Sequence, residues 1–215
     1  MSTHFRRGPG RPRKVPAEEQ RASLLVAARE VFATQGSTAA TVEQIARTAG
    51  LTRQSVYEHF GDKSALFAAV VAEVEELAVD WIGARARDGT EDLRAWARSN
   101  FAAMFEFVAE HPAALPVLQE AERAGDPALS RVRARLARLY TEASRRRWAE
   151  HGIEPGRTDV ALVTMSMAMA EALVNQAWEA EPPPREALID LLTEFTIGGV
   201  QRLREHGADI LTRLT

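Results

Sequence analysis

The sequence predicts an all-α protein with a short basic arm, a small set of N-terminal helices and a larger helical part. From residue 17 onward, apolar residues recur at three- and four-residue spacing, which is typical of helices with one buried face. The sequence has no run of alternating β-branched residues flanked by hairpin turns. Its 215 residues are 46% hydrophobic and 27% charged, enough to bury one large core or two smaller ones.

The N-terminal part is expected to contain one long helix. It begins at Ala17, because Pro16 suits the position just before a helix, and it ends at Gly36. Five apolar residues fall on one face of this helix: Leu24, Ala27, Ala28, Val31 and Phe32.

Two short helices follow it. Thr41 opens the first, Gly50 interrupts it, and Thr52 opens the second, which runs up to Gly61.

Beyond residue 62, glycine and proline divide the chain into further helices. The breaks include Asp88-Gly89, Pro112 and a run of three prolines at 182–184. Helices are therefore predicted at 62–87, 90–110, 112–124, 127–151, 158–180 and 184–206, with a short piece near 208–214.

The composition excludes several classes of function. Without cysteine there can be no disulfide scaffold, zinc finger, iron–sulfur cluster or thiol nucleophile. The longest uncharged apolar stretch, 160–170, is far shorter than the roughly 20 residues of a membrane span. No apolar segment follows the basic N-terminus, so we expect no secretory signal and a cytoplasmic protein that does not contact a membrane.

The charge is distributed unevenly along the chain. The net charge of −3 combines +4 in residues 1–70 with −7 in the remainder, so one end suits a polyanion. Residues 1–14 hold five basic side chains and no acid, and their glycines and prolines favour a flexible arm. Within the arm, Gly10-Arg11-Pro12 is similar to the core of an AT-hook, in which arginine enters a narrow minor groove. The alternative is a tail that only adds contacts to phosphates.

The segment from Thr41 to Phe60 has the pattern of a helix-turn-helix. Ala46 is small where two helices cross, Gly50 can take the positive φ of a tight turn, and Leu51 fills the angle between the helices. Val56 and Phe60 anchor the second helix inward. Its opposite face then presents polar side chains from the N-terminal turn, as a recognition helix does in the major groove.

These residues resemble the TetR family of bacterial transcriptional regulators. The match consists of Thr41-x-x-x-Ile45-Ala46-x-x-Ala49-Gly50-Leu51-Thr52 and Val56-Tyr57-x-His59-Phe60-x-x-Lys63, and it covers about residues 20–70. The resemblance implies a flexible basic arm at 1–16, a helix-turn-helix DNA-binding domain at 17–63 and a helical ligand-binding and dimerisation domain at 64–215. It also implies a homodimeric repressor that a small hydrophobic molecule releases from a double-stranded DNA operator.

The resemblance assigns DNA contacts to particular positions. Arg53 and Gln54 would reach base edges, which arginine does best at guanine and glutamine at adenine. The other assigned residues would contact phosphates: Thr41, Thr52, Ser55, Tyr57, His59 and Lys63. Independently of this resemblance, the AT-hook-like segment adds Arg11 of the arm as a DNA contact. Two alternatives stay open here. Gln54 could contact a phosphate instead of a base, and His59 or Tyr57 could pack inside the domain.

The larger helical part contains candidates for a ligand pocket. The helix from Trp96 to Val108 is apolar nearly all round, and Asn100 within it could orient a ligand or bond a nearby carbonyl. Three methionines between 165 and 169 suit an irregular apolar surface or an ordinary core. The expected ligand-binding residues are Trp96, Asn100, Met104, Phe107, Leu162, Met165, Met169 and Gln176.

The last long helix is the candidate dimer face. Its apolar stripe includes Leu188, Leu191, Phe195 and the small residues Gly198 and Gly199, which allow close helix approach. The helix that begins near residue 62 is expected to border the pocket and to transmit ligand binding to the DNA reader.

An enzyme or a protein-binding adaptor is the alternative class. The five histidines are scattered, and the motifs His-Glu-x-x-His, Gly-x-Ser-x-Gly and the phosphate loop do not occur. An adaptor would leave the basic arm without a role. We therefore expect no catalytic residue, no metal and no cofactor.

Overall fold

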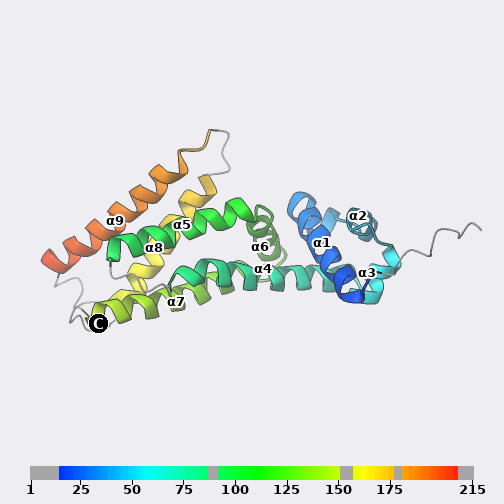
Figure 1. The fold of residues 1–215 in the computed structure, drawn as a ribbon, viewed down its shortest axis with the longest axis horizontal. Coiled ribbons are helices and arrows are strands. Elements are labelled where there is room, and N and C mark those ends of the chain that lie inside the picture. The colour runs from blue at the N-terminus through cyan, green and yellow to red at the C-terminus, as the bar shows by residue number, and fades with distance from the viewer. Residues whose placement is uncertain (1–14, 87–91, 151–156, 177–180, 208–215) are drawn as a thin grey trace, which may run out of the picture.

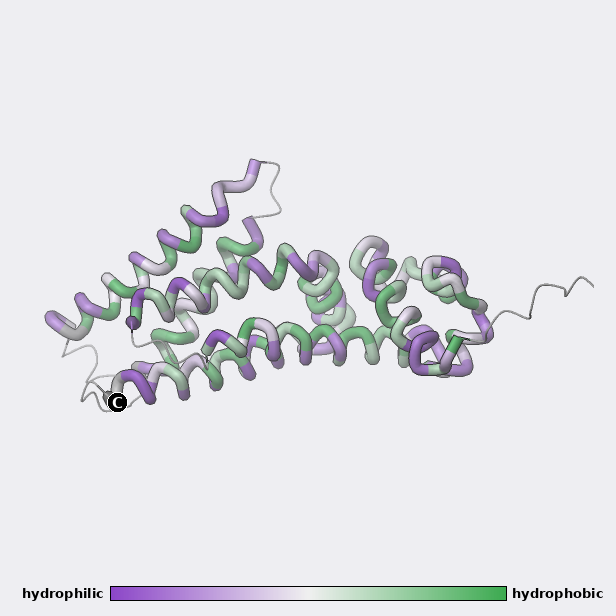
Figure 2. Tube along the Cα trace, viewed as in Figure 1, coloured by the Kyte–Doolittle hydropathy of each residue, from purple (hydrophilic) through white to green (hydrophobic). Residues whose placement is uncertain are grey.

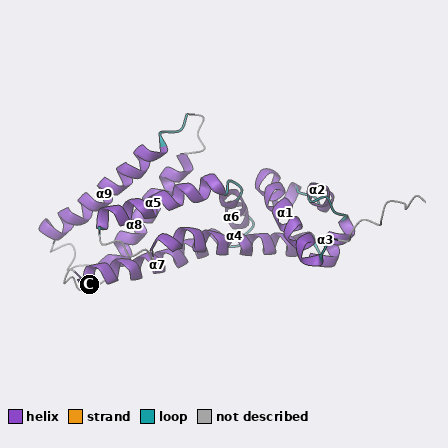
Figure 3. Ribbon diagram, viewed as in Figure 1, coloured by secondary structure: helices purple, strands orange, loops and turns teal. Residues whose placement is uncertain are grey.

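The computed structural model describes residues 15–86, 92–150, 157–176 and 181–207. These residues form nine helices and no strand (Figure 3). The helices are α1 Ala17–Ala39, α2 Val42–Thr48, α3 Arg53–Phe60, α4 Lys63–Ala86, α5 Leu93–Glu110, α6 Ala114–Arg123, α7 Ala128–Glu150, α8 Arg157–Gln176 and α9 Arg185–His206. The all-α prediction is confirmed. The helix expected near 208–214 lies outside the described residues.

The molecule is elongated, with α1, α2 and α3 grouped at one end (Figure 1). The long helix α4 runs from this group into the larger body, where it packs on α5, α6 and α7. The short helix α6 lies between the two parts and contacts both α1 and α4. The helices at the far end, α8 and α9, pack on α5.

Two apolar clusters hold this arrangement. The larger runs from α1 through α4 and α6 to α7, so the N-terminal helices share a continuous core with the body. The smaller lies between α5, α8 and α9 and includes Phe101, Phe105 and Ile189. Burial of apolar side chains is the main favourable contribution to folding. Hydrophobic and hydrophilic bands alternate along α9, which has one buried and one exposed face (Figure 2).

The first helix ends differently from the prediction. Its regular geometry breaks at Gly36, as expected, but the positive φ of 77° there is followed by one more helical turn that ends at Ala39. A Cβ at residue 36 would lie only 3.1 Å from Oε1 of Glu120 in α6, so glycine meets both a conformational and a steric requirement.

The basic face of α7 is paired with acidic residues. Arg131 bridges to Glu75 of α4, and Arg135 bridges to Glu76 at 2.7 Å. Arg133 binds Glu171 of α8 at 2.5 Å. Glu76 is exposed, so its pair with Arg135 contributes little stability, whereas buried Glu75 depends on Arg131 for its counter-charge. The three pairs neutralise these arginines, which therefore do not resemble a second polyanion site.

Within the described ranges, no single helix is long and apolar enough to span a membrane. The helices α5 and α6 reach that length and composition only together, across a bend of 86°.

Candidate nucleic-acid interface and ligand cavity

Local hydrogen bonds fix the geometry of α2 and α3. Thr41 caps α2, because its hydroxyl accepts the backbone N–H of Gln44 while the Gln44 side chain accepts the N–H of Thr41. Thr52 caps α3 by accepting the N–H of Ser55 at 3.1 Å. Between the helices, Gly50 has a φ of 66° and Leu51 donates to the carbonyl of Ala46 at 2.8 Å. The predicted tight turn is confirmed.

The leading face of α3 points to solvent. Buried Val56 anchors the helix from the opposite side. Arg53 and Gln54 are exposed, as are Tyr57, with 46% of its surface accessible, and Glu58. The side-chain amide of Gln54 donates to Oε1 of Glu58 at 2.7 Å. Tyr57 is therefore a surface residue and not part of the core, and the charged partner of Gln54 is a feature that the resemblance did not indicate.

The histidine of α3 is turned toward α1. The Nε2 atom of His59 lies 3.5 Å from Oε1 of Gln20, and the ring is half-buried. The guanidinium of Arg21 lies 5.1 Å above the adjacent Phe60 ring, which is a cation–π distance. This geometry favours the packing alternative for His59.

Lys63 differs most from its expected role. Its ammonium donates to the carbonyls of Ser37 at 2.8 Å, Ala40 at 2.9 Å and Thr38 at 3.2 Å. A lysine ammonium has three donors, and all three are used here. In this conformation Lys63 holds the end of α1 and has no donor left for a phosphate. Arg11, the residue of the arm that is expected to contact DNA, lies outside the described residues.

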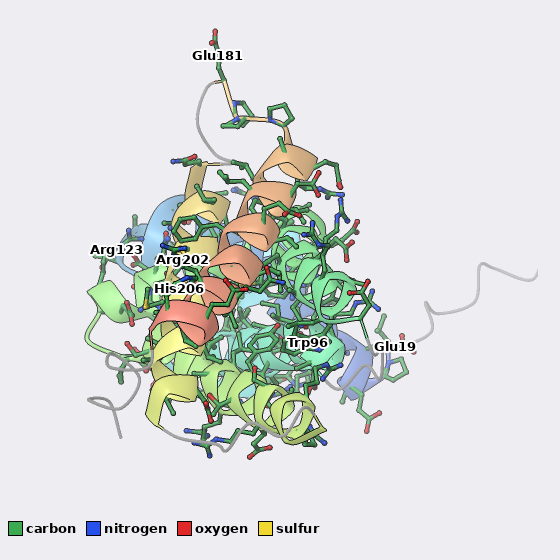
Figure 4. All side chains as sticks on the ribbon, turned by 90° about the vertical axis from the view of Figure 1, so that its left-hand side faces the viewer. Glu19, Trp96, Arg123, Glu181, Arg202 and His206 are labelled. Carbon is green, nitrogen blue, oxygen red and sulfur yellow. The ribbon has the colours of Figure 1, made fainter. Side chains whose placement is uncertain are left out.

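The larger body contains a cavity of about 90 Å³ between α5, α7, α8 and α9. Four of the expected ligand residues lie in its wall: Trp96, Asn100, Met104 and Leu162. Sequence reasoning missed other wall residues, including Tyr140, Ser144, Ser166 and Thr196. In the end-on view of Figure 4, Trp96 lies among packed side chains, whereas Glu19 and Glu181 lie at the outside.

The other four expected ligand residues lie elsewhere. Phe107 is buried in the larger core cluster, 5.2 Å from the His111 ring. Met165 is 58% exposed, Met169 packs in the smaller cluster, and half-buried Gln176 at the end of α8 is absent from the wall. The face of α8 that reaches the cavity instead carries Leu162, Val163, Ser166 and Met167.

The wall is apolar, and none of the described residues that line it carries a charge. No residue of α4 lines it either, which corrects the expectation that α4 borders the pocket. The link to α4 is indirect, because the hydroxyl of Tyr140 donates to the carbonyl of Ile82 at 3.2 Å. Burial raises the pKa of Tyr140, so its phenol stays protonated and keeps this bond.

A polar contact joins the larger body to the N-terminal helices. Oε1 of Glu120 in α6 accepts both the backbone N–H and the hydroxyl of Ser37, each at 2.7 Å. These bonds hold the pKa of Glu120 below its ordinary value, because they favour the charged carboxylate. Arg123, at 3.0 Å, adds to the effect.

Both α8 and α9 expose large apolar side chains. Leu191 is 57% exposed, Phe195 62% and Met165 58%. A Cβ added at Gly198 or Gly199 would meet nothing within 4 Å, so this surface is open to a neighbouring helix. Apolar patches of this kind mark interfaces. The described residues contain no group of three or more His, Asp or Glu side chains that could hold a metal ion.

The fold and these sites define a class of protein: a helix-turn-helix DNA-binding regulator with a helical ligand-binding body. Residues 24–70 match the family model described as bacterial regulatory proteins of the tetR family. The transcriptional repressor KstR2 of Mycobacterium tuberculosis is 33% identical over 145 residues, covering 64% of this chain and 68% of the relative. The chain belongs to the TetR family, whose members are ligand-responsive, DNA-binding regulators of transcription.

Other relatives extend the similarity over nearly the whole chain. The transcriptional activator FasR of Mycolicibacterium smegmatis is 27% identical over 217 residues, covering 94% of this chain and 95% of the relative. A TetR-like regulator from Rhodococcus sp. RHA1 has a similar fold, with a TM-score of 0.68 and 21% identity over 89% of this chain and 98% of its own. Regulators of this family bind DNA operators and small-molecule ligands as dimers.

Proposed function

We propose that this chain is a homodimeric repressor that binds its operator through α3 and leaves it when a small hydrophobic molecule enters the body. The observation that carries the proposal is the exposed leading face of α3, where Arg53, Gln54 and Tyr57 lie beside the capped N-terminus. Arginine and glutamine suit base edges, while Thr41, Thr52 and Ser55 at the helix starts suit phosphates. No catalytic role is included in the proposal.

The domain division is part of the same proposal. We assign 1–16 to the arm, 17–63 to the DNA-binding unit and 64–215 to ligand binding and dimerisation. The shared core of α1 and α4 makes the second boundary a mechanical joint, because a displacement of α4 or α6 must be transmitted to α1. Ligand binding would act at this joint.

The exposed apolar surface of α8 and α9 supports the dimer. Two α3 helices must be held at a fixed separation to read two half-sites, and the wide exposure of Phe195 and Leu191 is explained if a second copy covers them. The cytoplasm, where the DNA is found, is the proposed compartment.

The direct test is selection of bound sequences from random DNA, followed by a mobility-shift assay with the selected site. We expect a two-fold symmetric operator, and we expect Arg53→Ala to weaken binding by about 1–3 kcal/mol and relax one base position. Failure to enrich any sequence would refute DNA recognition by this chain.

The mode of regulation needs a separate test. A reporter gene under a promoter that contains the operator should be expressed more strongly when the gene for this protein is deleted. Reduced expression after the deletion would instead show activation.

A further inference from the structure

Three side chains in the cavity wall carry buried polar atoms without a hydrogen-bond partner among the described residues. They are Nε1 of Trp96, both amide atoms of Asn100, and Oγ1 of Thr196. Trp96 is only 8% exposed and Asn100 only 6%. Buried polar atoms are nearly always paired in native proteins, so an unpaired set in one wall indicates a missing partner.

The unpaired groups belong to two helices that pack together. Trp96 and Asn100 are four residues apart on α5 and therefore lie on the same face, while Thr196 approaches from α9. The cavity volume of about 90 Å³ exceeds the roughly 10–15 Å³ that one water molecule needs. The remaining wall is mainly apolar, with Met104 and Leu162 among its residues.

The donors and acceptors of these groups limit what can bind. The indole N–H of Trp96 only donates, the amide of Asn100 both donates and accepts, and the hydroxyl of Thr196 can do either. A complementary ligand head must therefore offer an acceptor and a donor together. An amide does so, because its C=O and N–H can form two reciprocal bonds with the Asn100 side chain.

The ligand is also expected to be uncharged. The wall residues that the structure describes carry no charge, and a buried ion without a counter-ion is strongly disfavoured. The guanidinium of Arg147 lies 4.3 Å from the centre of the Trp96 ring, so it is stacked on that ring rather than placed in the wall.

We propose that the cavity binds an uncharged amphiphile with an apolar body and an amide-like head, and that Asn100 pairs with this head beside Trp96 and Thr196. The proposal rests on the ligand-responsive function described above and specifies the chemistry of its ligand. In this proposal Asn100 selects the head group of the ligand, and the apolar wall limits the length of its apolar body.

The test uses the full-length protein without DNA and measures binding by calorimetry. The probes are straight-chain primary amides of four to ten carbons, with the carboxylate and the methyl ester of each length. We expect the amides to bind at least tenfold more tightly than both, a difference of about 1.4 kcal/mol. The proposal is overturned if no amide binds, or if a carboxylate or ester of equal length binds as well as its amide.

Two variants identify the residues responsible. Asn100→Leu should abolish the preference for amides and raise the melting temperature of the free protein, because it removes two unpaired buried atoms without reducing volume. Thr196→Val should weaken amide binding by a smaller factor. Asn175→Leu, the same exchange at an exposed position of α8 outside the wall, should keep the preference. An unchanged preference in Asn100→Leu, or a lower melting temperature, would show that Asn100 has an ordinary structural role and would refute the proposal.

The outcome of the operator experiment does not depend on the outcome of the amide-binding experiment. If amides bind with the stated preference but no DNA sequence is selected, the cavity chemistry stands and the regulatory function falls. If DNA is bound but the amide preference is absent, DNA recognition stands and the proposed cavity chemistry is refuted.

Discussion

Replacing Lys63 with methionine tests the role that the structure gives this residue. Methionine keeps most of the aliphatic stem and removes the ammonium that donates to the carbonyls of Ser37, Thr38 and Ala40. These carbonyls terminate α1, where the helix dipole favours a positive charge. We therefore expect Lys63→Met to destabilise the protein.

The magnitude follows from the hydrogen bonds. A bond to a charged group contributes about 1.5–3 kcal/mol, but three bonds to one half-buried ammonium are not additive. A net loss of about 2 kcal/mol is expected. For a chain of this size, 1 kcal/mol corresponds to about 2–4 °C, so the melting temperature should fall by about 4–8 °C.

Two measurements separate this role from a phosphate contact. Thermal melting reports the stability of the fold. The slope of log affinity against log salt falls by about 0.9 for each lost phosphate contact, or about 1.8 for a dimer that loses two. We expect Lys63→Met to melt earlier and to keep the wild-type slope. Arg53→Met, at an exposed site, is the control and should weaken operator binding without changing the melting temperature. A Lys63→Met protein with normal melting and a slope reduced by about two would refute this reasoning.

Three further predictions concern the dimer face, the α1–α6 contact and base preference. Phe195→Lys should convert the dimer to a monomer in sedimentation experiments, because it places a charge on the exposed apolar surface; a dimer that persists would contradict the assigned interface. Glu120→Gln should melt earlier than the wild type at neutral pH. The difference should close as the pH falls below about 4.5, because the lowered pKa of Glu120 makes its contribution depend on the carboxylate; a pH-independent gap would contradict this. Glu58→Gln should reduce any preference for cytosine, whose amino group a carboxylate accepts, and selected sequences identical to the wild type would rule this out.

The sequence predicts local structure best where the interacting residues are close together in the chain. The caps at Thr41 and Thr52 and the turn at Gly50 were predicted because their partners lie within a few residues. The partners of Lys63 are 23–26 residues away, and no local pattern records them.

The cavity was predicted less well for a related reason. A helix that is apolar on several faces does not reveal which face meets which neighbour, so Met165 was assigned to a pocket although it lies at the surface. The same ambiguity hides Thr196, since the apolar stripe of α9 indicates a dimer face and not a cavity wall. Packing between distant helices decides such positions.

The segment 36–40 connects the larger body to the N-terminal helices through two opposing attachments. Glu120 of α6 holds the N–H and hydroxyl of Ser37, while Lys63 of α4 holds the carbonyls of the same short turn. Tyr140 of the cavity wall is hydrogen-bonded to α4. Most aromatic residues of the wall belong to α5, which precedes α6 in the chain. Under the proposed function, a ligand that separates α5 from α7 would displace the two attachments relative to each other. Since Thr41 directly follows this turn and caps α2, such a displacement would change the orientation of α2 and α3 or break one attachment.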